Sequence, residues 1–187
     1  MSHRLPIRAP GSVIAVLSAL CLTSCLIAPP DPASTPADAI VQIHGSGGEE
    51  LGVATDYGIV FLGHTQRGGT VEYTAWYGDG PSPESGLVEP IGGGLFVTEP
   101  ELAVHRSAID FRTPKPGTRV RVVVRKGRGV REFAARVVAV EGAEGLFLAP
   151  NGELTRLGAT AVGAGIFLDH DASHALIGLL SGELELT

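Results

Sequence analysis

The chain has 187 residues, of which 44% are hydrophobic and 18% are charged, and its net charge is −6 at neutral pH. An acidic chain has no general attraction for a phosphate backbone, so nucleic acid is not expected as a partner. Two cysteines are too few for a disulfide framework.

The first 24 residues have the three parts of a secretory signal. Arg4 and Arg8 form a positive head, residues 13–22 are an apolar run, and small residues follow before Cys25. The run is too short to cross a bilayer, which needs about 20 apolar residues. The sequence Leu22-Thr23-Ser24-Cys25 resembles the lipobox of bacterial lipoproteins. This resemblance implies that residues 1–24 are cleaved and that Cys25 carries acyl chains such as palmitate.

Cleavage of this signal would change the composition of the mature chain. It would leave 12 basic against 20 acidic residues, a charge of −8, and it would remove Cys21. With Cys25 acylated, neither a disulfide nor a cysteine metal site is available. The expected location is the bacterial cell envelope. In such lipoproteins an Asp directly after the lipidated cysteine favours retention in the inner membrane. This chain has Leu26 there, which indicates the outer membrane. The alternative is an ordinary signal peptide with incidental cysteines.

A tether and one domain are expected after the signal. Residues 25–39 comprise the lipidated cysteine and a proline-rich stretch that acts as a semi-rigid spacer. Residues 40–187 are enough for one domain of ordinary size.

The domain is predicted to be all-β. Glycines recur every several residues, and the runs between them are rich in Val, Ile, Leu, Phe and Thr. No segment shows a sustained helical period. Strands are predicted at 40–44, 50–55, 58–62, 71–77, 94–97, 119–126, 130–140, 146–149, 165–169 and 175–180.

Two short segments resemble, in order, parts of the trypsin/chymotrypsin-like serine proteases. Residues 52–64 contain an Asp56-x-Gly58 turn and apolar residues before His64, which falls on the position of the catalytic base. Phe61-Leu62-Gly63 departs from the small residues usual there. In residues 99–106, Glu101 stands where the family has the aspartate that orients the histidine. A glutamate is one methylene longer but could still accept the imidazole proton.

A third segment, residues 157–182, resembles the nucleophile loop of that family and its closing strands. Where the family reads Gly-Asp-Ser-Gly-Gly-Pro, residues 160–165 read Thr-Ala-Val-Gly-Ala-Gly, which puts Val162 at the serine position. Valine has no hydroxyl to activate. Thr160 is the nearest hydroxyl, two residues away and hindered by its methyl group.

The resemblance implies two packed antiparallel β-barrels of the trypsin-like fold, in trimmed form. His64, Glu101 and Val162 would be the triad-equivalent positions, with Val162 non-functional. The function it implies is a lipid-anchored module that binds a protein or peptide and does not cut it. The alternatives are an active divergent endopeptidase and a structural envelope lipoprotein with an unrelated β fold. No cofactor is implied.

Two clusters lie outside this pattern. Residues 169–174 hold two carboxylates and two imidazoles, which could bind a divalent ion but more simply form a solvated turn, so no metal is assigned. The predicted hairpin 119–140 carries seven basic residues. It could touch anionic lipid or an acidic partner, or could be a strand surface kept soluble by its charge. The basic residues are Arg119, Arg121, Arg125, Lys126, Arg128, Arg131 and Arg136.

Overall fold

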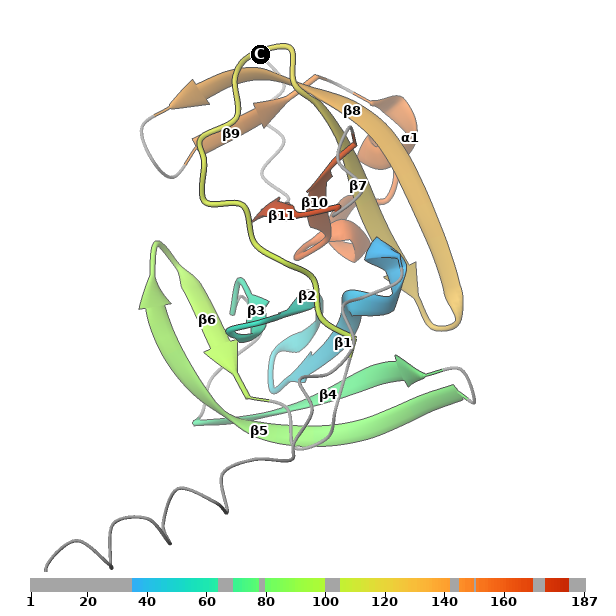
Figure 1. Ribbon diagram of the computed structural model, residues 1–187. Helices are drawn as coiled ribbons and strands as arrows, with labels where there is room; N and C mark the ends of the chain where they lie inside the picture. Colours follow the sequence, from blue (N-terminus) through green and yellow to red (C-terminus); the bar gives the residue numbers. More distant parts are fainter. Residues whose placement is uncertain are drawn as a thin grey trace, which may run out of the picture.

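The computed structural model describes residues 35–63, 69–77, 80–99, 105–141, 145–149, 151–169 and 174–181. The first half of the chain forms a closed antiparallel barrel with the strand order β1-β2-β3-β6-β5-β4, at the bottom of Figure 1. Its strands are β1 (Ile40–Gly45), β2 (Gly48–Thr55), β3 (Gly58–Phe61), β4 (Thr70–Tyr77), β5 (Gly80–Gly92) and β6 (Leu95–Thr98).

The second half forms a five-stranded antiparallel sheet with the order β11-β10-β7-β8-β9. The long β7–β8 hairpin is its largest part, and residues 105–118 lead to it from the barrel along one side of the molecule (Figure 1). Its strands are β7 (Arg119–Lys126), β8 (Gly129–Glu141), β9 (Gly145–Leu148), β10 (Gly165–Leu168) and β11 (Leu176–Leu179). The predicted all-β class is confirmed, and each of the ten predicted strands overlaps an observed one.

Strand β5 is the strand that sequence patterning missed. It contains Pro81 and Pro83, and proline cannot donate a hydrogen bond to a sheet ladder. The amide of Val88 donates to Gly69 on the β4 side, at 2.9 Å. Because amide direction alternates along a strand, odd-numbered residues face away from β4. On the side of β5 away from β4, no described strand pairs with residues 80–87. An amide at position 81 or 83 would therefore have no strand partner, so proline is tolerated at both positions.

Strand β2 is buried on both faces. Leu51 and Val53 pack in the core of the second sheet, which includes Val122, Ile166 and Phe167. Ala54, on the opposite face, packs in the barrel core with Ile43, Phe61 and Tyr73. Gly165 of β10 lies so close to β2 that an added Cβ would come within 3.0 Å of Val53 Cγ2. One strand therefore belongs to both hydrophobic cores.

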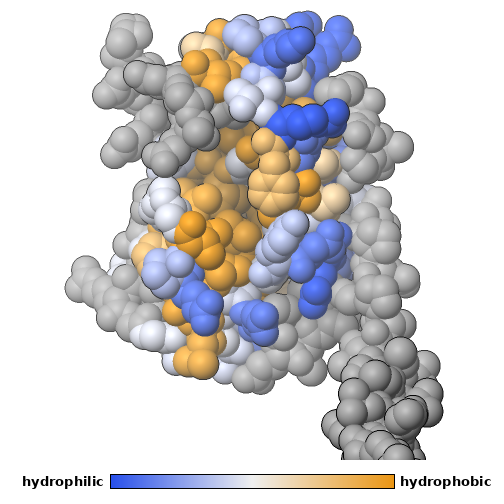
Figure 2. All heavy atoms as spheres, turned by 60° about the vertical axis from the view of Figure 1, so that its left-hand side comes forward, coloured by the Kyte–Doolittle hydropathy of each residue, from blue (hydrophilic) through white to orange (hydrophobic). Residues whose placement is uncertain are grey.

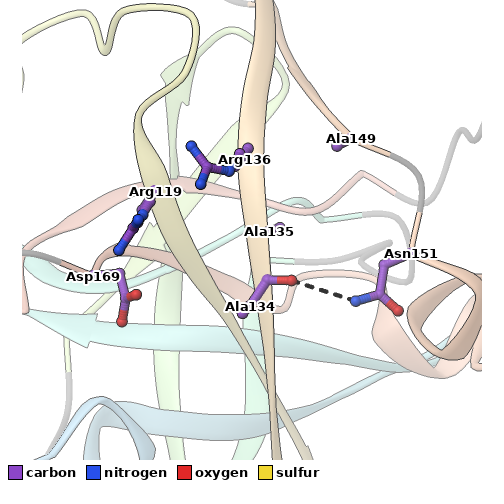
Figure 3. Close-up of a pocket in the computed structure, with 7 residues that line it drawn as sticks. All are labelled: Arg119, Ala134, Ala135, Arg136, Ala149, Asn151 and Asp169. Atoms are coloured by element: carbon purple, nitrogen blue, oxygen red, sulfur yellow. Dashed lines mark hydrogen bonds between the residues drawn. The ribbon is translucent and has the colours of Figure 1, made fainter.

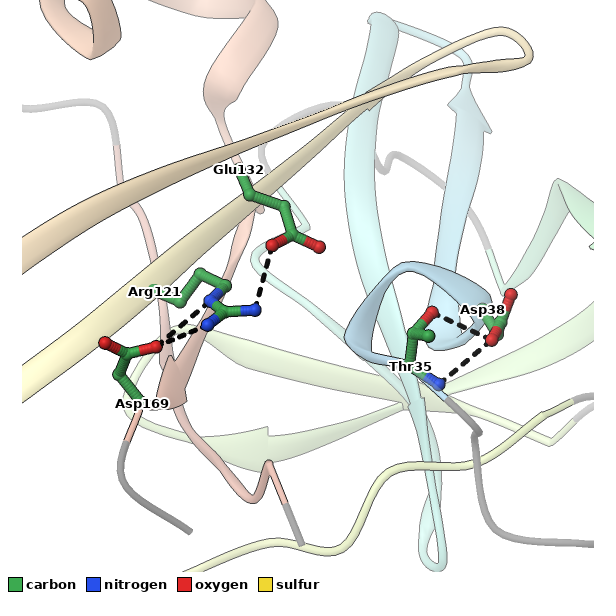
Figure 4. A network of polar contacts seen from close by, with 5 residues as sticks. All are labelled: Thr35, Asp38, Arg121, Glu132 and Asp169. Carbon is green, nitrogen blue, oxygen red and sulfur yellow. Dashed lines mark hydrogen bonds and ion pairs between the residues drawn. The ribbon is translucent and has the colours of Figure 1, made fainter. Parts of the chain in front are cut away.

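The helices found among the described residues are single turns: η1 (Pro36–Ala39), α1 (Gly152–Thr155) and η2 (Gly158–Ala161). Within the described part of the chain, no helix has the length and apolar character needed to cross a membrane. The η1 turn falls at the end of the predicted tether, yet Pro36 and Ala39 are buried. Asp38 closes this turn by accepting from the amide and hydroxyl of Thr35 (Figure 4). The folded domain thus begins a few residues before the predicted boundary at residue 40.

Arg125 shows that the interpretation of the β7–β8 hairpin as a solvated charged face was wrong at this position. Its side chain is 7% exposed, and its guanidinium carbon lies 5.4 Å from the ring centroid of Trp76 on β4. Nη2 donates to Ala37 O at 2.6 Å. This burial lowers the pKa of Arg125, against the opposing effect of the Asp38 charge. The physical reason is that the barrel covers this part of β7, so Val123 and Arg125 are buried although they share a face of β7 with the exposed Arg119.

We expect Val53→Ala to lower the free energy of unfolding by about 2–3 kcal/mol, because it removes two buried methyl groups and leaves a cavity between the two cores. Val138→Ala is the matched control, since Val138 is 51% exposed and should change stability by less than about 0.5 kcal/mol. Urea unfolding of both variants measures the difference. Equal effects would show that β2 does not join the cores.

Candidate functional site

Val162 lies in a loop that binds both halves of the protein. The loop passes through α1 and η2 and then enters β10. The Val162 carbonyl accepts from the Leu51 amide of β2 at 2.9 Å, while the Gly163 amide donates to Leu180 O, beyond β11, at 2.8 Å. The Val162 side chain is half-buried. The predicted nucleophile loop therefore rests directly on the barrel.

Gly163 permits this close approach. Its φ is +79°, and a Cβ at this position would overlap the carbonyl of Leu51. Only glycine combines this backbone conformation with this contact. Sequence patterning did not assign Gly163 a role, although a glycine directly after the predicted nucleophile position was a usable signal.

The chain that leads to His64 passes beside this loop. Phe61 pairs with Gly52, the residue next to Leu51. Gly63 is the last described residue before His64; its φ is +71°, and a Cβ there would overlap the ring of Phe96. Phe61 is fully buried and its ring lies 6.0 Å from that of Phe96. Aromatic packing thus explains why this segment departs from the small residues of the family pattern.

The described residues on either side of Glu101 contact strands β3 and β2. Before it, Thr98 of β6 pairs with Ile59 of β3. After it, the Ser107 amide donates to Ala54 O of β2 at 2.9 Å. The segments that bear the three triad-equivalent positions are thus all anchored on β2 and β3. His64 and Glu101 themselves lie outside the described residues, so their assignment stays a prediction, as does that of Val162.

The backbone amides of the Val162 loop are engaged within the protein. Thr160 N donates to Leu157 O at 3.2 Å, and Val162 N donates to Ala159 O at 3.3 Å. Ala164 N donates to Ala161 O at 3.0 Å. The Thr160 hydroxyl donates to Leu157 O at 2.6 Å. The loop is wound into a tight helical turn that turns these donors inward.

The acidic and imidazole cluster of residues 169–174 is described only at its ends. Asp169 accepts from Arg121 Nε at 3.2 Å and from Arg121 Nη2 at 2.5 Å, and Glu132 accepts from Nη1 at 3.0 Å (Figure 4). These acidic partners raise the pKa of Arg121. His174 accepts a long hydrogen bond through its carbonyl from Ser107. Residues 170–173 lie outside the described residues, and in the remainder no three potential metal ligands come together.

Comparison with known proteins supports the fold at low sequence identity. No protein-family model matches the sequence, and no curated protein sequence matches it. Among solved structures, the serine protease of a human pathogenic astrovirus is similar with a TM-score of 0.60, at 17% identity over 80% of this chain and 85% of that chain. The MamO protease domain from Magnetospirillum magneticum matches with a TM-score of 0.56, at 15% identity over 78% and 84% of the two chains.

A serine endoprotease from Yersinia pestis is also similar, with a TM-score of 0.57 and 16% identity over 78% of this chain and 54% of that chain. Together these likenesses confirm the predicted trypsin-like fold. At these identities the likeness concerns the fold, and the chemistry has to be argued from the site.

We expect Gly163→Ala to destabilise the protein by about 3 kcal/mol or more, because the new Cβ meets Leu51 and the positive φ is strained. Gly158→Ala is a control in the same loop: its φ is +51°, but no atom lies within 4 Å of the added Cβ. It should cost about 1 kcal/mol. Urea unfolding separates the two, and a Gly163 variant no less stable than the Gly158 variant would contradict the contact.

Proposed function

We propose that this chain is a lipid-anchored envelope protein whose trypsin-like domain binds a protein or peptide and does not cleave it. The observation that carries the proposal is the Val162 loop, which has no hydroxyl at the predicted nucleophile position and uses its backbone amides internally. A serine protease needs a nucleophile and a pair of amides that stabilise the oxyanion, and this one loop would supply both the nucleophile and the amides.

The first requirement is a nucleophile in contact with a base. In the Ser-His-Asp mechanism a serine oxygen attacks the scissile carbonyl after the histidine accepts its proton. Val162 has only methyl groups. The nearest alternative, Thr160, is exposed, and its hydroxyl donates to Leu157 O. Thr160 would have to break that bond and unwind η2 to act on a substrate.

The second requirement is a pair of amides aimed at the developing oxyanion. In proteases of this fold these amides belong to the nucleophile and to the residue two before it. The equivalent amides here are those of Val162 and Thr160, and both donate to carbonyls of their own turn. Loss of one such donor costs about 100- to 1,000-fold in rate. The loop therefore favours a domain without acyl-transfer chemistry.

Support for a binding role comes from an apolar surface. Figure 2 shows apolar side chains gathered across the middle of one face, framed by polar groups. Strands β6 and β11 carry half-buried apolar residues, and Phe111 of the connecting segment is 75% exposed. The apolar residues of the two strands are Leu95, Phe96, Val97, Ile177 and Leu179. Exposed apolar surface of this kind is typical of interaction sites.

The anchor rests on the sequence. Leu22-Thr23-Ser24-Cys25 follows a positive head and a short apolar run, which is the order of a lipoprotein signal. Nine residues then separate Cys25 from Thr35, where the described domain begins. Acylation of Cys25 would hold the domain close to the bacterial envelope membrane, with the outer membrane favoured by Leu26.

We expect the protein to remain unlabelled by a fluorophosphonate probe under conditions that label trypsin completely, because neither nucleophile nor oxyanion site is present. Val162→Ser should still react at less than about 1% of the rate of trypsin, since the amides of Thr160 and Val162 stay engaged. Gel fluorescence after timed labelling measures both rates.

Thr160→Ala and His64→Ala are the controls for this test. Labelling of the unmodified chain that either substitution abolishes would overturn the binding-only proposal and establish a divergent protease. Rapid labelling of Val162→Ser would show that the loop can form an oxyanion site.

We expect Cys25→Ser to abolish incorporation of labelled palmitate and to move the protein from the detergent phase to the aqueous phase of a Triton X-114 extraction. Cys21→Ser is the matched control and should change neither result, because that residue leaves with the signal. Equal palmitate incorporation by all forms would place the acyl chain at another residue, and no incorporation by any form would exclude acylation.

A further inference from the structure

A concave surface that encloses a volume of about 410 Å³ lies in the second sheet, at the end of the β7–β8 hairpin opposite its turn. Figure 3 shows its walls, which come from paired positions on β7 and β8, the residue after β9, the cap of α1 and the residue after β10. None of them belongs to the Val162 loop. The lining residues are Arg119, Ala134, Ala135, Arg136, Ala149, Asn151 and Asp169.

Two arginines lie side by side on this surface (Figure 3). Arg119 and Arg136 are direct partners in the β7–β8 register, so their side chains leave the same face of the sheet. Like charges directly opposite each other on paired strands are destabilising. An anion bound between them would offset this repulsion. Both side chains are exposed, and across the described ranges neither forms an ion pair with a carboxylate. Arg136 makes one hydrogen bond at the limit of the range, 3.5 Å to Gly117 O.

The other polar groups of the wall are already bound. Asp169 accepts two hydrogen bonds from Arg121, both through Oδ1, and Arg121 does not line the surface. Asn151 Nδ2 donates to Ala134 O at 3.4 Å, and its Oδ1 caps α1 by accepting from Glu153 N and Leu154 N. The basic groups left to meet a ligand are the two guanidinium ions, and Ala134, on the same face of β8 as Arg136, lies beside them.

We propose that this surface binds an acidic segment of a polypeptide, with a glutamate or aspartate carboxylate held between Arg119 and Arg136. The planar guanidinium donates two parallel hydrogen bonds that match a carboxylate. The methyl group of Ala134 suits the aliphatic stem of such a side chain. The volume lies in the range of ligand pockets, and the exposure of both arginines suits a side chain presented by a partner.

The test is fluorescence anisotropy of a fluorescein-labelled octaglutamate peptide with the full-length protein in neutral detergent at low ionic strength. Arg119→Gln/Arg136→Gln should weaken binding about 10-fold or more, as expected for lost charge-assisted hydrogen bonds. Lys126→Gln/Arg128→Gln removes the same charge from the exposed hairpin tip and should change the affinity less than about 3-fold. Arg119→Lys/Arg136→Lys, which keeps the charge but loses the fork, should fall between them.

Several outcomes would overturn the proposal. They are no binding by the unmodified protein, equal losses in the two glutamine double variants, or displacement of the peptide by inorganic phosphate at lower concentration than by free glutamate. The last result would assign the surface to phosphate. Far-ultraviolet circular dichroism verifies folding of each variant, and all of these results are independent of whether the Val162 loop is catalytic.

Discussion

The burial of strand β2 on both faces is the constraint on which the rest of the molecule depends. Its side chains alternate between the barrel core and the core of the second sheet, so neither half can shift without opening the other. The same strand receives the Val162 loop through the Leu51 amide and the connecting segment through Ala54 O. A single strand thereby fixes both the relative position of the two cores and the place where the predicted triad segments approach one another.

The Val162 loop is held in place by backbone contacts within its own turn and with both halves of the protein. Valine stands at the predicted nucleophile position, and the η2 turn satisfies the backbone amides of Thr160 and Val162. Gly163 still allows the loop to pack tightly against β2. The contacts that hold the loop in place are therefore well developed, and the proposal of a binding role rests on this loop.

Much of the fold could be predicted from local sequence pattern, because alternation and glycine turns mark strands such as Arg119–Lys126 directly. The trypsin-like resemblance came from the order of three weak segments. Strand β5 was missed because Pro81 and Pro83 argue against a strand unless the free side of their backbone is known. The burial of Arg125 depends on contacts with Ala37 and Trp76, which are distant in the sequence, so no local pattern contains it.

The contact of Arg125 with the chain entry has a mechanical consequence. Arg125 of β7 hydrogen-bonds Ala37 and lies against Trp76 of β4, so the start of the domain is fastened to both halves at once. A force applied through the residues before Thr35 would act on the Arg125 contacts with Ala37 and Trp76 before it acted on the hydrogen bonds between β1 and β2. The force would be distributed over both the barrel and the second sheet, so strand β1 would not be the first element to separate from the domain.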